Sequence, residues 1–211
     1  MIFRKDNQGH KGYEDDSWKE TGKSPWLRSL GEFILEVIKV VVISLAIIIP
    51  VRYFIIQPFY VKGASMEPNF YDHQYLIIDE ITYRLSDPQR GDIIVFRYPK
   101  ETSQYFIKRI IGLPGEQVEI SNGQIFIYNK DYPNGKAINE ELYLASDVKT
   151  YDNRLVKLGS SDYFVLGDNR TASMDSRSFG PVARKYIIGK AWLRGWPLNQ
   201  ISIFKTPDYQ L

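Results

Sequence analysis

The chain has 211 residues, enough for one domain together with a membrane anchor or a small insertion. Its net charge of +2, with 25% charged residues, gives no case for nucleic-acid binding. It has no cysteine, which excludes thiol catalysis, disulfides and thiolate metal sites. The two histidines, His10 and His73, are too few for a multi-histidine metal site. We therefore expect chemistry that needs neither a metal nor an organic cofactor.

The N-terminal part of the chain changes from polar to strongly apolar. Residues 1–32 are polar and of mixed charge, which predicts a tail, and the apolar segment begins too far in for a cleavable signal peptide. Residues 33–57 are long enough to form a transmembrane helix. Glu36 and Lys39 lie near one end, where long side chains can reach the interface, and residues 40–51 are uncharged on every face. This pattern favours a spanning helix over an amphipathic helix packed on a soluble core.

The remainder, residues 58–211, has the pattern of a β domain. Short β-prone segments alternate with turn signals, and Asn122-Gly123 is a strong hairpin signal between residues 118–120 and 125–127. The predicted strands are 59–61, 75–81, 92–98, 105–111, 117–120, 124–128, 163–166 and 186–193. Residues 129–161 are polar and weakly patterned, which predicts a loop-rich excursion with a short helix near 139–145. The fold class expected is mainly β: an antiparallel, barrel-like domain after one N-terminal transmembrane helix.

Ser65 lies just past the apolar segment and is the candidate nucleophile. A serine hydroxyl needs a base, and His73 invites a Ser–His interpretation. Its only evident acidic partner, Asp72, is a chain neighbour that we expect cannot easily face the ring. Lys108, in the apolar predicted strand 105–111, is the stronger candidate, because burial disfavours the charged form of a lysine. Its neighbour Arg109 stays protonated and cannot serve as a base.

Four ordered blocks, together with the apolar segment, resemble the conserved boxes of bacterial type I signal peptidases, over most of residues 33–203. They are Ser65-Met66-Glu67-Pro68, Arg90-Gly91-Asp92, Lys108-Arg109 followed by Gly112-Leu113-Pro114-Gly115, and the stretch 167–177, which ends in Ser173-Met174-Asp175-Ser176-Arg177. The resemblance implies a Ser–Lys dyad of Ser65 and Lys108. It also implies that Ser173 hydrogen-bonds the lysine, although a turn serine bonded to its own backbone is the alternative.

The other polar residues of these blocks are expected to support the site. Asp168, Arg170, Asp175 and Arg177 look like an ion-paired frame around it. Arg90-Gly91-Asp92 is interpreted as a turn and a core strand rather than as an adhesion motif. The backbone N–H of Ser65 is one expected oxyanion donor. Some relatives have a hydroxyl two residues before the nucleophile; this chain has Gly63 there, so a second backbone N–H or a water must serve.

The segment before Ser65 predicts how a substrate is held. Phe59, Val61, Gly63 and Ser65 would share one strand face, along which an extended peptide could lie. Met66 and either Phe106 or Ile107 would close this face. The resulting pockets should be shallow and apolar, and should take small side chains at the first and third positions before the cut, as in the Ala-x-Ala exit of secretory signal peptides.

These expectations combine into a membrane-bound serine endopeptidase that removes signal peptides from secreted preproteins. Its partners would be those signal peptides and the lipid bilayer, with no nucleic acid. Its tail would be cytoplasmic and its catalytic domain extracytoplasmic, although the Lys and Arg counts on the two sides are nearly equal. Two rivals stay open. A LexA-like self-cleaving repressor shares Ser–Lys chemistry but needs a DNA-binding helix-turn-helix, and a silent membrane-anchored binding protein could share the fold.

Overall fold

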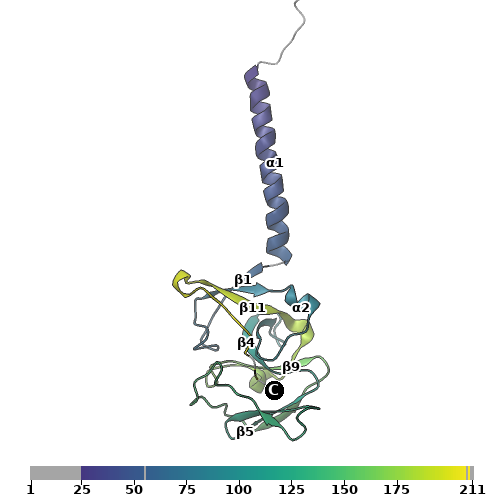
Figure 1. Cartoon of the computed structure of the whole chain (residues 1–211), viewed down its shortest axis with the longest axis vertical. Helices are drawn as coiled ribbons and strands as arrows, with labels where there is room; N and C mark the ends of the chain where they lie inside the picture. Colours follow the sequence, from purple (N-terminus) through teal and green to yellow (C-terminus); the bar gives the residue numbers. More distant parts are fainter. Residues whose placement is uncertain (1–24, 55, 208, 210–211) are drawn as a thin grey trace, which may run out of the picture. The chain divides into compact units, whose positions relative to one another are not determined.

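The computed structural model describes residues 25–54, 56–207 and 209, and the contacts divide the chain into two compact units, Met1–Ile48 and Ile49–Leu211. Helix α1 runs from Pro25 to Phe54 (Figure 1). Its stretch Ser29–Pro50 is 22 residues long, contains an 18-residue window with a mean hydropathy of 2.6, and is not buried by the rest of the chain. At about 1.5 Å per residue this stretch is about as long as the hydrocarbon core of a bilayer is thick.

The helix differs from its predicted bounds at both ends. It begins eight residues before Phe33, since α1 starts at Pro25, and it ends at Phe54 rather than at residue 57. Residues 56 and 57 belong to strand β1, Ile56–Tyr60. The residue before a proline is restricted to extended conformations, so the Gln57-Pro58 sequence favours a strand here. Only residue 55, which lies outside the described part, separates helix from strand.

The second unit contains two antiparallel sheets. The larger sheet has eight strands in the order β1-β2-β11-β3-β4-β9-β10, with β12 paired to β11. The smaller has the order β7-β6-β5-β8. Their remaining bounds are β2 Tyr75–Asp79, β3 Ile93–Arg97, β4 Tyr105–Gly112, β5 Gln117–Ser121, β6 Gln124–Tyr128, β7 Lys136–Ala137, β8 Arg154–Lys157, β9 Asp162–Leu166, β10 Val182–Ala183, β11 Ile187–Trp196 and β12 Ser202–Ile203.

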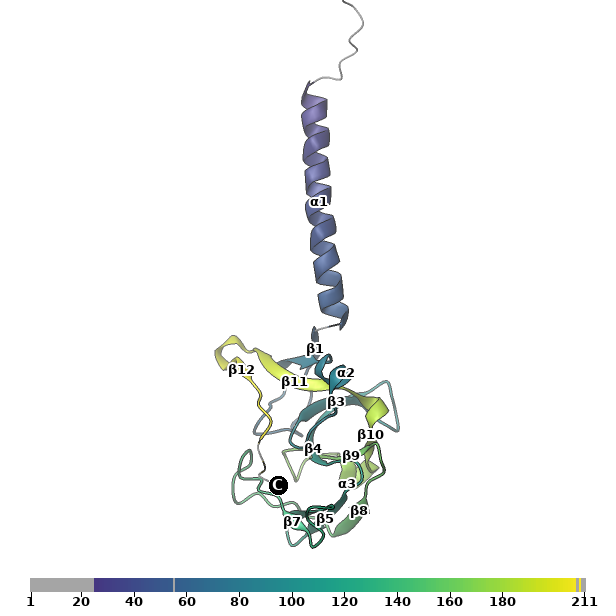
Figure 2. The same ribbon diagram turned by 45° about the vertical axis from the view of Figure 1, so that its right-hand side comes forward.

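Short helical turns connect some of these strands. They are α2 Thr82–Leu85, α3 Ser176–Phe179 and the 3-10 turns η1 Arg184–Tyr186 and η2 Leu198–Gln200. Figure 2 shows β5, β7 and β8 on the far side of β9 from β1 and β11. The mainly antiparallel β fold is confirmed, but the strand order is an open path and the larger sheet does not close into a barrel.

Strand β4 connects the parts of the core. Ile107 packs with the cluster on the β1–β2–β3–β11 face that contains Val61, Met66 and Phe70. Ile110 packs with the cluster on the opposite face, and Ile111 with the cluster between the two sheets. Because β4 is fixed on both faces, the side chains between these residues are held in defined positions.

The predicted excursion contains structure that its sequence did not indicate. Strands β7 and β8 complete the smaller sheet on either side of the β5–β6 hairpin. That hairpin turns at Asn122 and Gly123, both with positive φ, as their sequence predicted. The helix expected near residues 139–145 is wrong. A single turn stands there, in which the N–H groups of Tyr143 and Leu144 donate to the carbonyl of Glu140. So short a segment gains too few bonds to extend as a helix.

Candidate active site

Ser65 lies on the loop between β1 and β2. We expected a single strand face from Phe59 to Ser65, but β1 ends at Tyr60, so that face is interrupted. Gly63 takes φ +89°, a left-handed conformation that favours glycine, and its N–H donates to Asp72 Oδ1 at 2.9 Å. This turn redirects the chain and brings Ser65 over the larger sheet.

A second loop, residues 167–172 after β9, holds the serine loop in place. The backbone N–H of Asn169 donates to the carbonyl of Ser65 at 3.1 Å, and its side-chain amide donates to the carbonyl of Ala64 at 3.1 Å. Asn69, on the serine loop, donates to Asp168 Oδ2 at 2.8 Å. The backbone on both sides of Ser65 is therefore fixed by residues about a hundred positions later in the chain.

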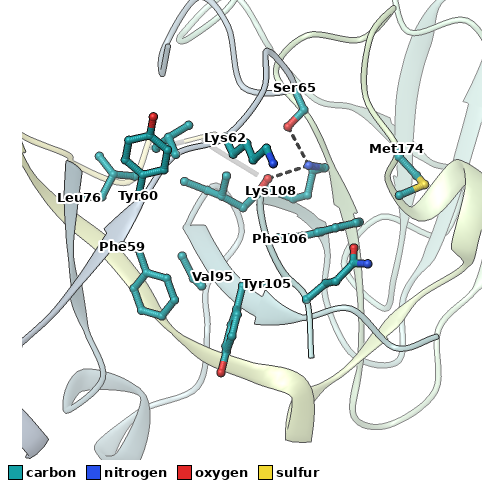
Figure 3. A pocket seen from close by; sticks show the side chains of 13 residues that line it. Phe59, Tyr60, Lys62, Ser65, Leu76, Val95, Tyr105, Phe106, Lys108 and Met174 are labelled. Atoms are coloured by element: carbon teal, nitrogen blue, oxygen red, sulfur yellow. Dashed lines mark hydrogen bonds between the residues drawn. The ribbon is translucent and has the colours of Figure 1, made fainter. Parts of the chain in front are cut away.

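Lys108 lies on β4, and its side chain extends to Ser65. Its Nζ lies 2.8 Å from Ser65 Oγ, in hydrogen-bond contact, and donates to the carbonyl of Ile107 at 2.8 Å (Figure 3). The residue is only 4% exposed, and its Nζ is 5.3 Å from the ring centroid of Phe106. Burial lowers the pKa of Lys108 to about 8, against the opposing effect of the Asp175 and Asp168 carboxylates.

His73 is not placed to replace this lysine. Its side chain is 76% exposed, and its Nδ1 lies 2.9 Å from Asp72 Oδ2. Our expectation that Asp72 cannot easily face the ring is therefore wrong: His73 has φ +67°, a conformation that lets the two neighbours meet. The histidine is absent from the lining of the cleft that contains Ser65 and Lys108.

Ser173 does not hydrogen-bond Lys108 in this structure. Its Oγ is buried without a well-formed hydrogen bond to a described residue. Ser173 lies close to the serine loop because Gly167, which stands between them, has no side chain. A Cβ added at Gly167 would lie 2.1 Å from Ser173 Oγ and 2.4 Å from the carbonyl oxygen of Ser65. The glycine thus lets the two loops approach each other.

The four expected frame residues are all buried or partly buried and ion-paired, but only two of them pair with each other. Asp175 accepts from Arg177 Nε at 2.9 Å and Nη2 at 2.8 Å. Asp168 instead pairs with Arg109, from Nε at 2.8 Å and Nη2 at 2.7 Å. Arg170 pairs with Glu140, Nη2 to Oε1 at 2.6 Å. Sequence reasoning missed Arg109 and Glu140 as partners; the one available signal was that Arg109 faces away from Lys108 on the same strand.

The carboxylate of Asp175 is held ionised at the edge of the site. Burial alone would raise its pKa, but hydrogen bonds from Arg177 and from the N–H of Gly167, with the nearby Ser173 hydroxyl, outweigh burial and hold the pKa below its usual value. Asp175 also caps α3, since it accepts from the N–H of Arg177. Asp175 therefore carries a fixed negative charge beside Ser65 and Lys108.

The cleft beside Ser65 has a volume of about 550 Å³. Of the six predicted substrate-binding residues, four line it: Phe59, Val61, Phe106 and Ile107. Gly63 and Met66 are not among the lining residues, and Met66, 1% exposed, packs in the core with Phe70. Met174 and Tyr105 line the cleft and were not predicted. In Figure 3, Ser65 lies toward one end of the cleft and Phe59 and Tyr105 toward the other.

A buried amine in contact with a serine at one end of an apolar cleft is an arrangement suited to acyl transfer. Residues 34–196 match the model of the family described as signal peptidase, peptidase S26. The chain belongs to that family. It is therefore a serine peptidase that cleaves signal peptides.

Several relatives of this signal peptidase are known by sequence. It is 38% identical over 174 residues to a probable signal peptidase I-2 of a Synechocystis species, covering 80% of this chain and 76% of that one. It is 34% identical to signal peptidase I P of Bacillus subtilis subsp. natto, covering 80% and 92%. A crystal structure of a signal peptidase I from Enterococcus faecalis V583 matches with 32% identity and a TM-score of 0.41, over 50% of this chain and 97% of that one.

Proposed function

We propose that this signal peptidase is a single-pass membrane endopeptidase that uses Ser65 as nucleophile and Lys108 as general base. The observation that carries the proposal is the 2.8 Å contact between Lys108 Nζ and Ser65 Oγ, with the lysine 4% exposed. A general base must lie within hydrogen-bond reach of the proton it takes, and its pKa should be near the working pH. The Lys108 pKa of about 8 satisfies the second condition.

The two groups act in both halves of the reaction. Neutral Lys108 takes the Ser65 proton as Oγ attacks the scissile carbonyl, and the resulting ammonium gives that proton to the leaving amine. In the second half, Lys108 takes a proton from a water that attacks the acyl-enzyme ester and returns it to Ser65. In neutral Lys108, one N–H of Nζ donates to the Ile107 carbonyl, and this orients the single lone pair of the nitrogen toward the Ser65 hydroxyl.

The backbone N–H of Ser65 is the first donor for the oxyanion, as it makes no hydrogen bond within the described part of the chain. The N–H of Gly63 is not available as a second donor, because Asp72 already accepts from it. A side-chain donor at position 63 would need a non-glycine residue at φ +89°, which is strained. A water or another backbone N–H therefore completes the oxyanion site.

The substrate lies extended between β1 and the first half of β4. Residues 105–108 of β4 pair with β3 on one side only, since the pairing of β4 with β9 begins at Arg109. Their free edge can pair with a peptide strand. The side chains of Val61, Phe106 and Ile107 make the nearest walls apolar, which suits alanine-sized side chains at the first and third positions before the cut.

The stretch Ser29–Pro50 anchors the enzyme in the membrane, with the residues before it cytoplasmic and the domain from residue 58 outside. Only residue 55 separates α1 from β1, so the substrate strand follows the anchor directly in the chain. This linkage suits a peptidase whose substrates are themselves anchored by an apolar segment.

The activity is tested by incubating the full-length protein in detergent with a preprotein that carries an Ala-x-Ala exit. We expect one cut, after the second alanine, and none in a variant preprotein with bulky residues at both alanine positions. Labelling of Ser65 by an acylating inhibitor would separate this proposal from a silent binding protein. A LexA-like repressor is disfavoured because an apolar helix precedes the domain.

A further inference from the structure

A second cavity continues the substrate cleft beyond Tyr105. It has a volume of about 710 Å³, and the residues that define it here, as the outer basin, are Glu80, Arg97, Thr102, Tyr105, Lys185 and Ile188. Tyr105 lines both cavities. Its ring meets Phe59 edge to face, with 5.5 Å between ring centroids. These two rings therefore separate an inner, apolar cleft from the outer basin.

The two cavities share one face of the larger sheet, and the outer basin is also lined by Tyr186 and Ile187, which pack with the cluster on the opposite face. Side chains alternate along a strand, so Arg97 faces the same way as Val95, and Tyr105 the same way as Ile107. Val95 and Ile107 belong to the core cluster beneath the inner cleft, and Ile188 packs against that cluster. Arg97 and Tyr105 are paired across β3 and β4. The floor thus changes from apolar to charged along one continuous face.

The outer basin contains two positively charged side chains without an ion-pair partner in the described part of the chain. Arg97 and Lys185 are exposed, and neither makes an ion pair within the described part of the chain; each lies near an aromatic ring, Tyr105 at 5.8 Å and Tyr186 at 5.1 Å. The basin's own carboxylate, Glu80, is 3.8 Å from Arg84. On the nearby turn, the Glu101 carboxylate accepts from Ser103 and Gln104.

Strand spacing tells which substrate residue reaches this basin. Tyr105 is three residues from Lys108, which corresponds to about 10 Å along an extended chain. A peptide whose scissile bond lies at Ser65 therefore passes Tyr105 near its third or fourth residue before the cut. Because alternate side chains share a face, the first, third and fifth residues of the peptide point toward the sheet. The first and third lie in the inner cleft, and the fifth lies beyond Tyr105, at the outer basin.

We propose that the outer basin is a subsite for the fifth residue before the scissile bond, and that Arg97 and Lys185 select an acidic side chain there. The inference rests on the proposed function, since it needs the acyl side of the substrate to lie between β1 and β4. It adds a charge preference upstream of the apolar pockets.

The test compares three peptides that differ only at the fifth residue before the cut: glutamate, glutamine or lysine. The full-length enzyme in zwitterionic detergent at low salt should cleave the glutamate peptide with a kcat/KM roughly 3- to 10-fold above that of the lysine peptide, as expected for exposed ion pairs. In about 0.5 M salt the ratio should fall toward one.

Charge-reversed variants make the test specific. Arg97→Gln with Lys185→Gln should abolish the preference, and Arg97→Glu with Lys185→Glu should reverse it. Lys130→Gln with Lys157→Gln is the matched control, because both lysines are exposed, on or beside the smaller sheet, and the net charge changes equally. Melting temperatures verify that each variant is folded.

Three outcomes would overturn the inference. Equal rates on all three peptides in the wild type would show that no charge subsite exists. A preference for the glutamate peptide that survives charge reversal at Arg97 and Lys185 would show that other residues cause it. The same holds if the control substitutions at Lys130 and Lys157 also remove the preference. Cleavage of none of the peptides, nor of the Ala-x-Ala preprotein, would instead refute the proposed function, and the inference would fall with it.

Discussion

The environment of Lys108 suits its amine to the base role that we propose for it. Phe106 and the strand around it remove the side chain from water, while Asp175 and Asp168 act in the opposite sense. Burial prevails, and the pKa falls to about 8. If these carboxylates were not themselves paired with Arg177 and Arg109, their charge would hold Lys108 protonated more strongly. The ion-paired frame therefore has an electrostatic as well as a geometric effect on the base.

Removing either member of the dyad should stop the reaction. We expect Ser65→Ala and Lys108→Ala each to lower kcat by a factor of about 10⁴ or more, and the double variant to be no worse, since the two groups act as a unit. His73→Ala is the control and should retain activity, because its side chain is 76% exposed and is bonded to Asp72. Single-turnover cleavage measures this. An active Lys108→Ala, with activity lost in His73→Ala, would reverse the assignment.

Activity should rise with pH through an apparent pKa near 8, because only neutral Lys108 can take the serine proton. The measurement is kcat/KM between about pH 6 and 10. A lysine with the reference pKa of about 10.4 would place the rise in rate above this range. A rate still climbing toward pH 10 would mean that Lys108 is an ordinary charged lysine in the free enzyme.

The same shift has a consequence for stability. A lysine whose pKa is lowered in the folded state binds fewer protons folded than unfolded, so its destabilising effect is full below about pH 8 and disappears toward pH 10.5. The effect amounts to about 3 kcal/mol at 1.36 kcal/mol per pKa unit. Lys108→Met should therefore melt at the same or a higher temperature than the wild type at pH 7, and the difference should shrink by pH 10. A strongly destabilised Lys108→Met at pH 7 would contradict this.

Sequence reasoning predicted that Ser65 and Lys108 would meet, but not which groups position them. Ser65 and Lys108 stand in recognisable local blocks, and the structure brings them into contact. Asn69 and Glu140 carry no local signal. Their roles arise only because a loop, a turn and the 167–172 segment meet in three dimensions. Buried polar groups require partners, but the sequence does not say which distant residue supplies them.

At the level of elements, the site depends on how closely the 167–172 loop approaches the serine loop. Gly167 lies at this junction: its N–H donates to Asp175, and its carbonyl accepts from Arg170. Since Asn169 in the same loop holds the carbonyls of Ala64 and Ser65, any displacement of the loop moves the nucleophile. Precise placement matters here, because a shift of about 1 Å can reduce a rate about a hundredfold.

Gly167→Ala should therefore damage both catalysis and stability. The added Cβ would lie 2.4 Å from the Ser65 carbonyl, so the loops must separate. We expect kcat to fall roughly a hundredfold, with a loss of about 1–3 kcal/mol in stability from overpacking. Gly195→Ala on β11 is the matched control, because its nearest neighbours are 3.9 Å away. Wild-type kcat in Gly167→Ala would show that this junction is not critical.

The elements themselves were predictable to the extent that their signals are local. The Asn122-Gly123 hairpin was predicted because its turn chemistry is contained in two residues. β8, with the sequence Arg-Leu-Val-Lys, was missed, since four residues of mixed polarity gain their strand conformation only by pairing with β5. The open sheet order, likewise, depends on which strands pair, and short alternating segments do not encode that choice.

At the scale of the whole molecule, the apolar helix α1 and strand β1 are separated by one residue in the sequence. Whichever side of the membrane receives β1 also receives Ser65, so orientation decides which compartment is served. The charges are nearly balanced: Lys19, Lys23 and Arg28 precede the apolar stretch, and Arg52 and Lys62 follow it. The small excess before it favours a cytoplasmic N-terminus.

Single cysteines test this orientation, because the native chain contains none. One variant is Lys5→Cys, in the N-terminal part outside the described residues. Asp208, the natural choice near the C-terminus, also lies outside the described residues. The second variant is therefore Lys130→Cys, at an exposed position after β6. In intact cells a membrane-impermeant maleimide should label position 130 and not position 5, and after permeabilisation it should label both. Cleavage assays on each variant verify that the anchored enzyme is intact. Labelling of position 5 alone in intact cells would place the catalytic unit in the cytoplasm, on the wrong side for exported preproteins.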